Sequence, residues 1–167
     1  MFSQTDFENI IWNFLFTYRQ FLLNGYMHNR VRDDSYGITP ATWNTILISL
    51  ETGTVLGLAR LLEREKDFGR KFGNEDINII SEKIIKIRKS YIAHNDLSKI
   101  RNRDSFLKDN QLTGSEIIII INALKDRAIQ YQESHNFKID VDDLFKKTTQ
   151  NCLKDLNIWL KSFKVEL

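Results

Sequence analysis

A single proline in a chain of 167 residues is the feature that most constrains the fold, because proline is the residue that most strongly disrupts a helix. The chain also has only seven glycines, the next most helix-weakening residue. Long helices can therefore run without interruption. Apolar residues agree with this, because they recur at steps of three and four along much of the sequence. The pattern predicts a protein made of helices.

Capping signals predict where several of these helices begin. Ser3 followed by an acid at Asp6 is typical of a helix N-terminus, and the first long helix should continue from there with apolar residues to Leu22. Thr39 and Pro40 have the order of a cap and a first helical residue, because proline has no N–H to lose at that position. The sequence therefore predicts two long helices on either side of a polar connector.

A third helix should carry apolar residues from Ile77 to Tyr91, after a polar loop over 66–74. A fourth should begin at Thr113 and Glu116, after a charged connector over 97–112. A fifth should begin near Asp140. These segments complete a set of five helices.

The five isoleucines from Ile117 to Ile121 carry a competing signal, because β-branched runs favour a strand locally. A good helix-forming sequence follows them, however, and no partner strand is apparent. We therefore expect a helix here, and a strand anywhere in 113–134 would contradict the periodicity argument.

Five helices with mostly short connections predict an all-α fold, an antiparallel up-and-down bundle in one domain over residues 1–167. Gly53 and Gly57, four apart in the second helix, predict close approach of another helix, with a kink as the alternative. Trp43 and Trp159 lie at apolar helical positions and are expected in the core.

Composition narrows the class of protein. A hydrophobic content of 42% and a charged content of 28% fit an ordinary globular protein. The net charge of +2 is too small to attract nucleic acid strongly to the protein as a whole. Cys152 is alone, which excludes a disulfide within the chain and a site of several thiolates. The N-terminal residues include acidic side chains and are not expected to form a signal peptide, and the longest uncharged apolar run is five residues. We expect a cytoplasmic protein that does not bind a membrane.

The segment Arg-Lys-Ser-Tyr-Ile-Ala-His-Asn-Asp, from Arg88 to Asp96, carries the strongest chemical signal. A guanidinium keeps its charge and can clamp a phosphate through a planar fork of donors. An imidazole titrates near neutrality and can move the proton of an attacking hydroxyl. Arg88 and His94 are therefore candidate catalytic residues for metal-free cleavage of a phosphodiester.

Spacing alone does not decide the role of this pair. Arg88 and His94 are six positions apart, which is about 120° around a regular helix, with Tyr91 between them. Convergence on one atom needs either a helix that loosens before His94 or a second copy of the segment across a two-fold axis. A structural interpretation also stays open, in which Arg88 interacts with the helix dipole or the surface and His94 caps the helix.

Two blocks of the sequence resemble the HEPN domain superfamily. The first is the Arg88–Asp96 segment, which resembles the family's signature of an arginine, four to six residues and a histidine. The second is Trp43, Leu50 and then Gly57-Leu-Ala-Arg-Leu-Leu-Glu-Arg-Glu65, which resembles a helix of abortive-infection HEPN proteins of the U type. The resemblance covers residues 41–96. It implies a helical bundle, commonly a homodimer, with metal-independent endoribonuclease activity in toxin–antitoxin or phage-defence settings.

The resemblance gives Arg88 and His94 the two signature roles. Lys89 departs from the polar Asn, Asp or His that usually follows the arginine. Asn95-Asp96 also lacks the tyrosine two places after the histidine at which some family toxins are modified by an antitoxin.

Other residues near the signature are candidates for binding RNA. The basic stretch from 99 to 103 could contact the RNA backbone, with an exposed loop as the alternative. The candidate substrate-binding residues are Lys89, Tyr91, Asn95, Asp96, Arg101 and Arg103.

The remaining polar residues carry weaker signals. His28 and His135 are expected at helix ends as surface or capping residues, and the charged run 63–67 is expected to be a solvated face with pairing one turn apart.

Two functions follow as hypotheses. The first is an endoribonuclease without metal or cofactor, which cleaves RNA by attack of the 2′-hydroxyl and works as a homodimer. An antitoxin or a nucleotidyltransferase is its candidate partner. The second is a non-catalytic helical module that binds RNA, a nucleotide or a partner protein; Lys89 and the modest net charge favour it.

Overall fold

The protein is an all-helical bundle in the computed structural model, which describes residues 3–29, 38–64, 71–89 and 111–162. These residues form five helices and no strand: α1 (Gln4–His28), α2 (Pro40–Arg64), α3 (Glu75–Ile87), α6 (Gly114–His135) and α7 (Val141–Ser162). The helical interpretation of Ile117–Ile121 is confirmed, because the whole run lies within α6. Most of the expected connectors lie outside the described residues.

The capping signals of the sequence are present as reciprocal hydrogen bonds. Ser3 Oγ accepts from the backbone N–H of Asp6 at 3.1 Å, and Asp6 Oδ2 accepts from the backbone N–H of Ser3 at 3.1 Å. Thr113 and Glu116 form the same box at the start of α6. Each box satisfies N–H groups that a helix start otherwise leaves without a partner, which explains why α1 and α6 begin where they do.

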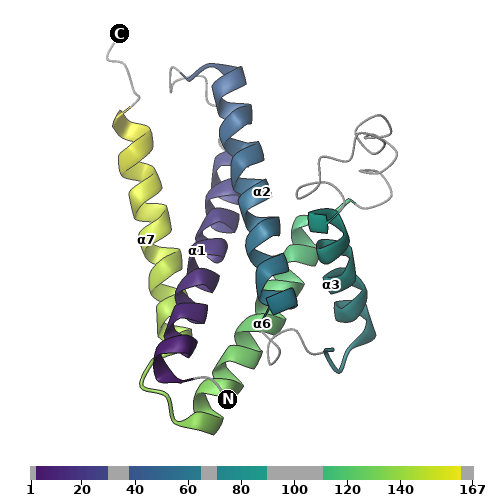
Figure 1. Ribbon diagram of the computed structural model, residues 1–167. Helices are drawn as coiled ribbons and strands as arrows, with labels where there is room; N and C mark the ends of the chain where they lie inside the picture. Colours follow the sequence, from purple (N-terminus) through teal and green to yellow (C-terminus); the bar gives the residue numbers. More distant parts are fainter. Residues whose placement is uncertain (1–2, 30–37, 65–70, 90–110, 163–167) are drawn as a thin grey trace.

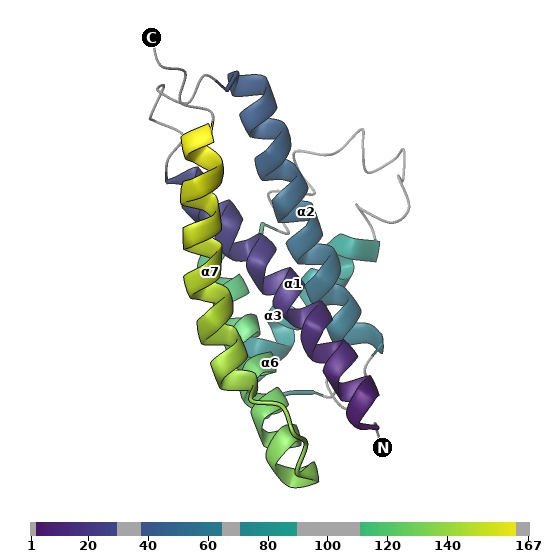
Figure 2. The same cartoon turned by 90° about the vertical axis from the view of Figure 1, so that its left-hand side faces the viewer.

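Successive helices run in alternating directions and close into a ring (Figure 1). Each described helix contacts the next one along the chain, and α7 returns to pack against α1. Turned by 90°, the bundle shows α7 and α1 side by side with α3 and α6 behind them (Figure 2). One buried cluster draws on all five helices, with Phe14, Leu58, Ile84, Leu124 and Phe145 among its members.

A smaller cluster lies where α1 ends, α2 begins and α7 ends. Trp43 is buried there with Met27 and Leu160, as the sequence predicts, although its indole N–H has no hydrogen-bond partner among the described residues. The prediction for Trp159 is wrong: its side chain is 37% exposed. The buried positions of this part of α7 step by four residues, through 152, 156 and 160, so residue 159 lies beside that stripe rather than on it.

The two glycines of α2 lie where α1 approaches it closely. A Cβ atom at Gly57 would lie 2.7 Å from Cγ2 of Thr17, and one at Gly53 would lie 2.8 Å from Cδ of Gln20. Both distances are too short for a real methyl group. The prediction of close helix approach is therefore confirmed.

One described helix, α2, is long and apolar enough to cross a membrane by length and composition alone. Its most apolar window is 39% buried inside the bundle. Packing against α1 and α3 therefore accounts for part of its apolar character.

Glu116 links α6 to α3 through an ion pair with Lys83, and this pair makes the stability of the bundle depend on pH. Lys83 Nζ lies 2.8 Å from Glu116 Oε1, and this hydrogen bond lowers the pKa of the Glu116 carboxyl below 4.5. A lowered pKa in the folded state means that the stabilisation is present above pH 4.5 and is lost as the pH falls toward the folded-state pKa.

We expect Glu116→Gln to lower the free energy of unfolding at pH 7 by about 1 kcal/mol, or roughly 2–4 °C in Tm, because the charge of the pair is lost while one amide oxygen can still accept. At pH 3 the difference from wild type should shrink, since Glu116 is then increasingly protonated in both states of the wild-type protein. Thermal melts at both pH values test this. Glu133→Gln, an exposed change on the same helix, is the control. An equal difference at pH 3 and pH 7 would contradict the role of the charge.

Candidate functional site

Arg88, the first residue of the signature, lies directly after α3 and is paired with Glu63 of α2. Arg88 Nη1 donates to Glu63 Oε2 at 2.6 Å, and Lys89 Nζ lies 3.2 Å from Glu63 Oε1. The Glu63 side chain is only 17% exposed. One carboxylate of α2 thus holds the two adjacent cations that follow α3.

Right-handed helical geometry continues at least to Arg88, whose φ and ψ are −57° and −51° and whose backbone N–H donates to the carbonyl oxygens of Ile84 and Ile85. The chain from 90 to His94 lies outside the described residues, so loosening of the helix before His94 stays a prediction.

The other signature residues lie outside the described part of the chain. The structure places the candidates Arg88 and Lys89 side by side on Glu63. The remaining candidates are outside the described residues: Tyr91, His94, Asn95, Asp96, Arg101 and Arg103.

The interpretation of residues 63–67 as a solvated face is wrong for Glu63. Its carboxylate reaches across to α3 and pairs with residues 25 and 26 positions further along the chain rather than one turn away. Local charge spacing contains no information about such a pair, because the pair depends on how two helices are set against each other. The sequence offers one indication of a role for Glu63: the residue lies in the block from Gly57 to Glu65 that carries the second resemblance.

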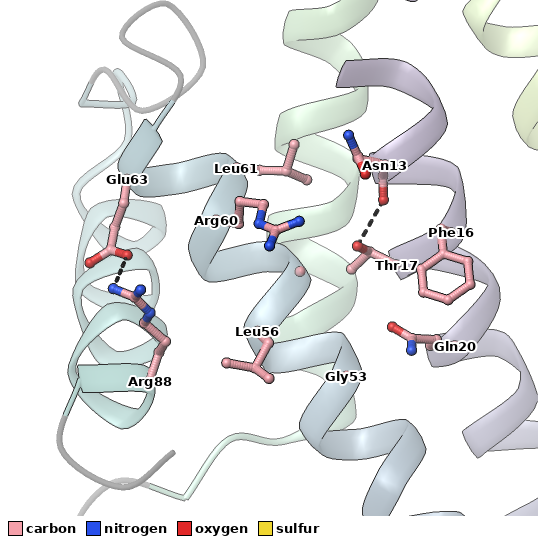
Figure 3. Close-up of a pocket in the computed structure, with 11 residues that line it drawn as sticks. Asn13, Phe16, Thr17, Gln20, Gly53, Leu56, Arg60, Leu61, Glu63 and Arg88 are labelled. Atoms are coloured by element: carbon pink, nitrogen blue, oxygen red, sulfur yellow. Dashed lines mark hydrogen bonds and ion pairs between the residues drawn. The ribbon is translucent and has the colours of Figure 1, made fainter. Parts of the chain in front are cut away.

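Arg88 and Glu63 line one side of a pocket of about 290 Å³ over the outer surface of α2. The other side is formed by α1, with Asn13, Phe16 and Gln20 (Figure 3). Figure 3 shows the Arg60 guanidinium turned from α2 toward α1, along the side of α2 where Gly53 and Gly57 also line the pocket. The apolar and charge patterns of the sequence did not predict any of these groove residues as part of a site.

The charge of this corner is positive. Among the described residues that line the pocket or pair with Glu63, the three cations Arg60, Arg88 and Lys89 stand against the carboxylate of Glu63. Among the described residues, Arg88 uses one of its five N–H donors, on Glu63, so its other N–H groups can donate to an anion. Arg60 makes no hydrogen bond or ion pair with any residue in the described ranges. The arrangement suits a phosphate group at the mouth of the pocket.

The other residues considered in the sequence analysis, His28, His135 and Cys152, do not line the pocket. His28 is exposed at the end of α1, and His135 ends α6 with its ring stacked on Tyr131 at 4.1 Å between centroids. Burial raises the pKa of the Cys152 thiol, which lies in the core between α7 and α1. Within the described residues, no three His, Cys, Asp or Glu side chains gather as a metal site would require.

A scan against models of protein families found no match, and neither did searches among curated proteins and among solved structures.

Proposed function

We propose that the protein is a metal-independent endoribonuclease of the HEPN type, with Arg88 and His94 as its catalytic pair. The observation that supports this most is the position of Arg88, held by Glu63 at the edge of a cationic pocket, with most of its donors unused by any described residue. A guanidinium fixed in this way can bind the charge that develops on a phosphate during cleavage without reorganising first.

The chemistry needs one base, one acid and one anion-binding group. His94 takes the proton from a 2′-hydroxyl, whose oxygen attacks the adjacent phosphorus and forms a new P–O bond. The bond from phosphorus to the 5′-oxygen breaks, and the leaving oxygen takes a proton from imidazolium. Arg88 stabilises the negative charge on the phosphorane. The products are a 2′,3′-cyclic phosphate and a 5′-hydroxyl.

The experiment that tests this function is incubation of purified protein with a mixed RNA in excess chelator. We expect cleavage, and we expect the 3′ ends of the products to resist ligation and polymerase extension until the cyclic phosphate is removed. Absence of cleavage both with and without divalent metal would contradict the proposal.

The active unit in this proposal is a homodimer. A two-fold axis would bring two Arg88–His94 segments to one cleft and supply the convergence that a single regular helix lacks. Sedimentation at micromolar concentration should give twice the mass of the chain. A monodisperse monomer would contradict this assembly.

The setting that goes with this activity is a cytoplasmic toxin or phage-defence effector. An antitoxin or a nucleotidyltransferase would then be its partner, and a gene for one of these beside the gene for this chain would support the assignment.

Glu63 acts in this proposal as a positioning residue for Arg88. We expect Glu63→Gln to lower kcat for RNA cleavage about tenfold with a smaller change in KM, because the amide holds the guanidinium less firmly than a carboxylate does. Stability should change by no more than about 1 kcal/mol, since the pair is partly exposed. Steady-state kinetics and thermal melts check both.

The matched control is Asp155→Asn, which weakens the pair between Arg19 Nη2 and Asp155 Oδ2 on the other side of α1. Its cleavage rate should equal that of wild type. If both variants cleave at the wild-type rate, Glu63 has no positioning role.

The alternative function is a non-catalytic helical module that binds RNA, a nucleotide or a partner protein. The same ion pair favours it, because Glu63 ties α3 to α2 through Arg88 and Lys89 in the manner of a structural contact. Protein that binds RNA but leaves it intact in the experiment above would support the module.

A further inference from the structure

The pocket beside Arg88 contains an aromatic ring that the packing of the bundle does not use. Phe16 lines the pocket from α1, and 65% of its surface is exposed. Its neighbours Phe14 and Leu15 are buried in the core, so the helix places Phe16 on the outer face by its periodicity. An exposed phenylalanine ring at the rim of a pocket is available for stacking.

The inner wall of the pocket provides amide groups with unused hydrogen-bonding capacity. The Gln20 amide is half-buried on α1, lies against Gly53 and makes no hydrogen bond to any described residue. Asn13 donates one side-chain N–H to the carbonyl oxygen of Asn9 at 2.9 Å, and its own side-chain oxygen accepts from no described residue. Amides offer both donors and acceptors, which is what the edge of a nucleobase requires.

The size and charge of the pocket indicate what else the ligand must carry. A volume of about 290 Å³ lies at the lower end of the range for small-molecule sites, so there is room for one ring system but not for a folded segment. Arg60 and Arg88 both line the pocket, so the ligand should also bring negative charge. A base joined to its phosphates satisfies both conditions, and a neutral apolar ligand does not.

We propose that this pocket binds one unstacked base of a single-stranded RNA, next to the phosphate that Arg88 contacts. Phe16 stacks on the base, the Gln20 amide hydrogen-bonds its edge, and Arg60 holds a flanking phosphate. The inference deepens the endoribonuclease proposed above and rests on it for the role of Arg88. It makes the α1–α2 groove the determinant of which nucleotide lies beside the cleaved bond.

The test measures binding rather than cleavage, so that its failure is distinct from failure of the nuclease proposal. Full-length protein carrying His94→Ala is titrated with a fluorescent single-stranded RNA and with a ribose-phosphate strand of equal length that lacks bases. Phe16→Ala in this background should weaken binding of the RNA about 5- to 100-fold, the loss of one base stack, and leave the abasic strand unaffected. Arg60→Gln should weaken binding of both strands. It should also reduce the slope of log affinity against log salt concentration by about the amount expected for one phosphate contact.

The matched control is Trp12→Ala, which removes another aromatic ring from α1 that is 58% exposed and does not line the pocket. It should leave the affinity for both strands unchanged. If Phe16→Ala has no effect on the RNA, or if it weakens RNA and abasic strand equally, the base site is wrong. An equal loss from Trp12→Ala would also overturn it, because the contact would then be a general property of exposed rings.

A second variant tests the floor of the pocket. Gly53→Ala introduces a Cβ that would lie 2.8 Å from the Gln20 side chain, which must move away. Since alanine is the better helix former, the variant should fold. We expect its preference among the four homopolymeric RNAs to fall at least fivefold, whereas an unchanged preference would exclude Gln20 from reading the base.

Discussion

Replacement of His94 by alanine should lower the rate of RNA cleavage by two or more orders of magnitude while the bundle stays folded. General acid–base catalysis by a positioned side chain contributes about 10²–10⁴-fold, and alanine can neither accept nor donate the proton. Cleavage of a labelled RNA in excess chelator measures the rate. Thermal melts of the same preparation measure the fold.

Arg88→Lys should also abolish most of the activity, although it keeps the charge. An ammonium is a point charge and cannot both donate to Glu63 and present a fork of N–H groups to a phosphate. Arg19→Lys is the matched control, because Arg19 is also paired with a carboxylate but lies at the α1–α7 surface. If wild-type protein cleaves RNA and both the His94 and the Arg88 variants cleave equally well, the catalytic assignment is wrong.

Gly57→Ala should destabilise the protein by about 1–3 kcal/mol, even though alanine is intrinsically the better helix former. The added Cβ would lie 2.7 Å from Cγ2 of Thr17, a buried and β-branched side chain that cannot turn away easily. The expected fall in Tm is about 2–4 °C for each kcal/mol, measured by thermal or denaturant unfolding.

Gly25→Ala is the control for helix propensity. Gly25 lies within α1, and a Cβ there would have no atom within 4 Å. This variant should be up to about 1 kcal/mol more stable than wild type. A Gly57→Ala protein as stable as the Gly25→Ala protein would mean that α1 and α2 do not pack as closely as described.

The elements of the fold could be predicted because their signals are local. Capping pairs such as Thr113 with Glu116 lie three residues apart, and the apolar period belongs to a single helix. The apolar period also explains the wrong prediction for Trp159. A residue three positions from a buried one, as Trp159 is from Leu156, can still lie at the margin of a narrow apolar stripe.

The candidate site was harder to predict because it is built between helices. Arg88 could be identified from its chemistry and from the resemblance of its segment. Its partner Glu63 could not be identified, because 25 residues and a change of helix separate the two. The groove lined by Phe16 and Gln20 depends on how α1 is rotated against α2, and neither helix contains that information alone.

The closure of the ring by α7 has a consequence for how the chain acquires its fold during translation. Tyr18 of α1 hydrogen-bonds Thr149 of α7, and 131 residues separate the two positions. At about 5–20 residues per second, a ribosome delivers this partner on the order of ten seconds after α1 has been synthesised. Throughout that interval Phe14 lacks the ring of Phe145, on which it packs edge to face in the finished bundle. The apolar face of α1 is therefore a natural substrate for a chaperone until the last described helix emerges.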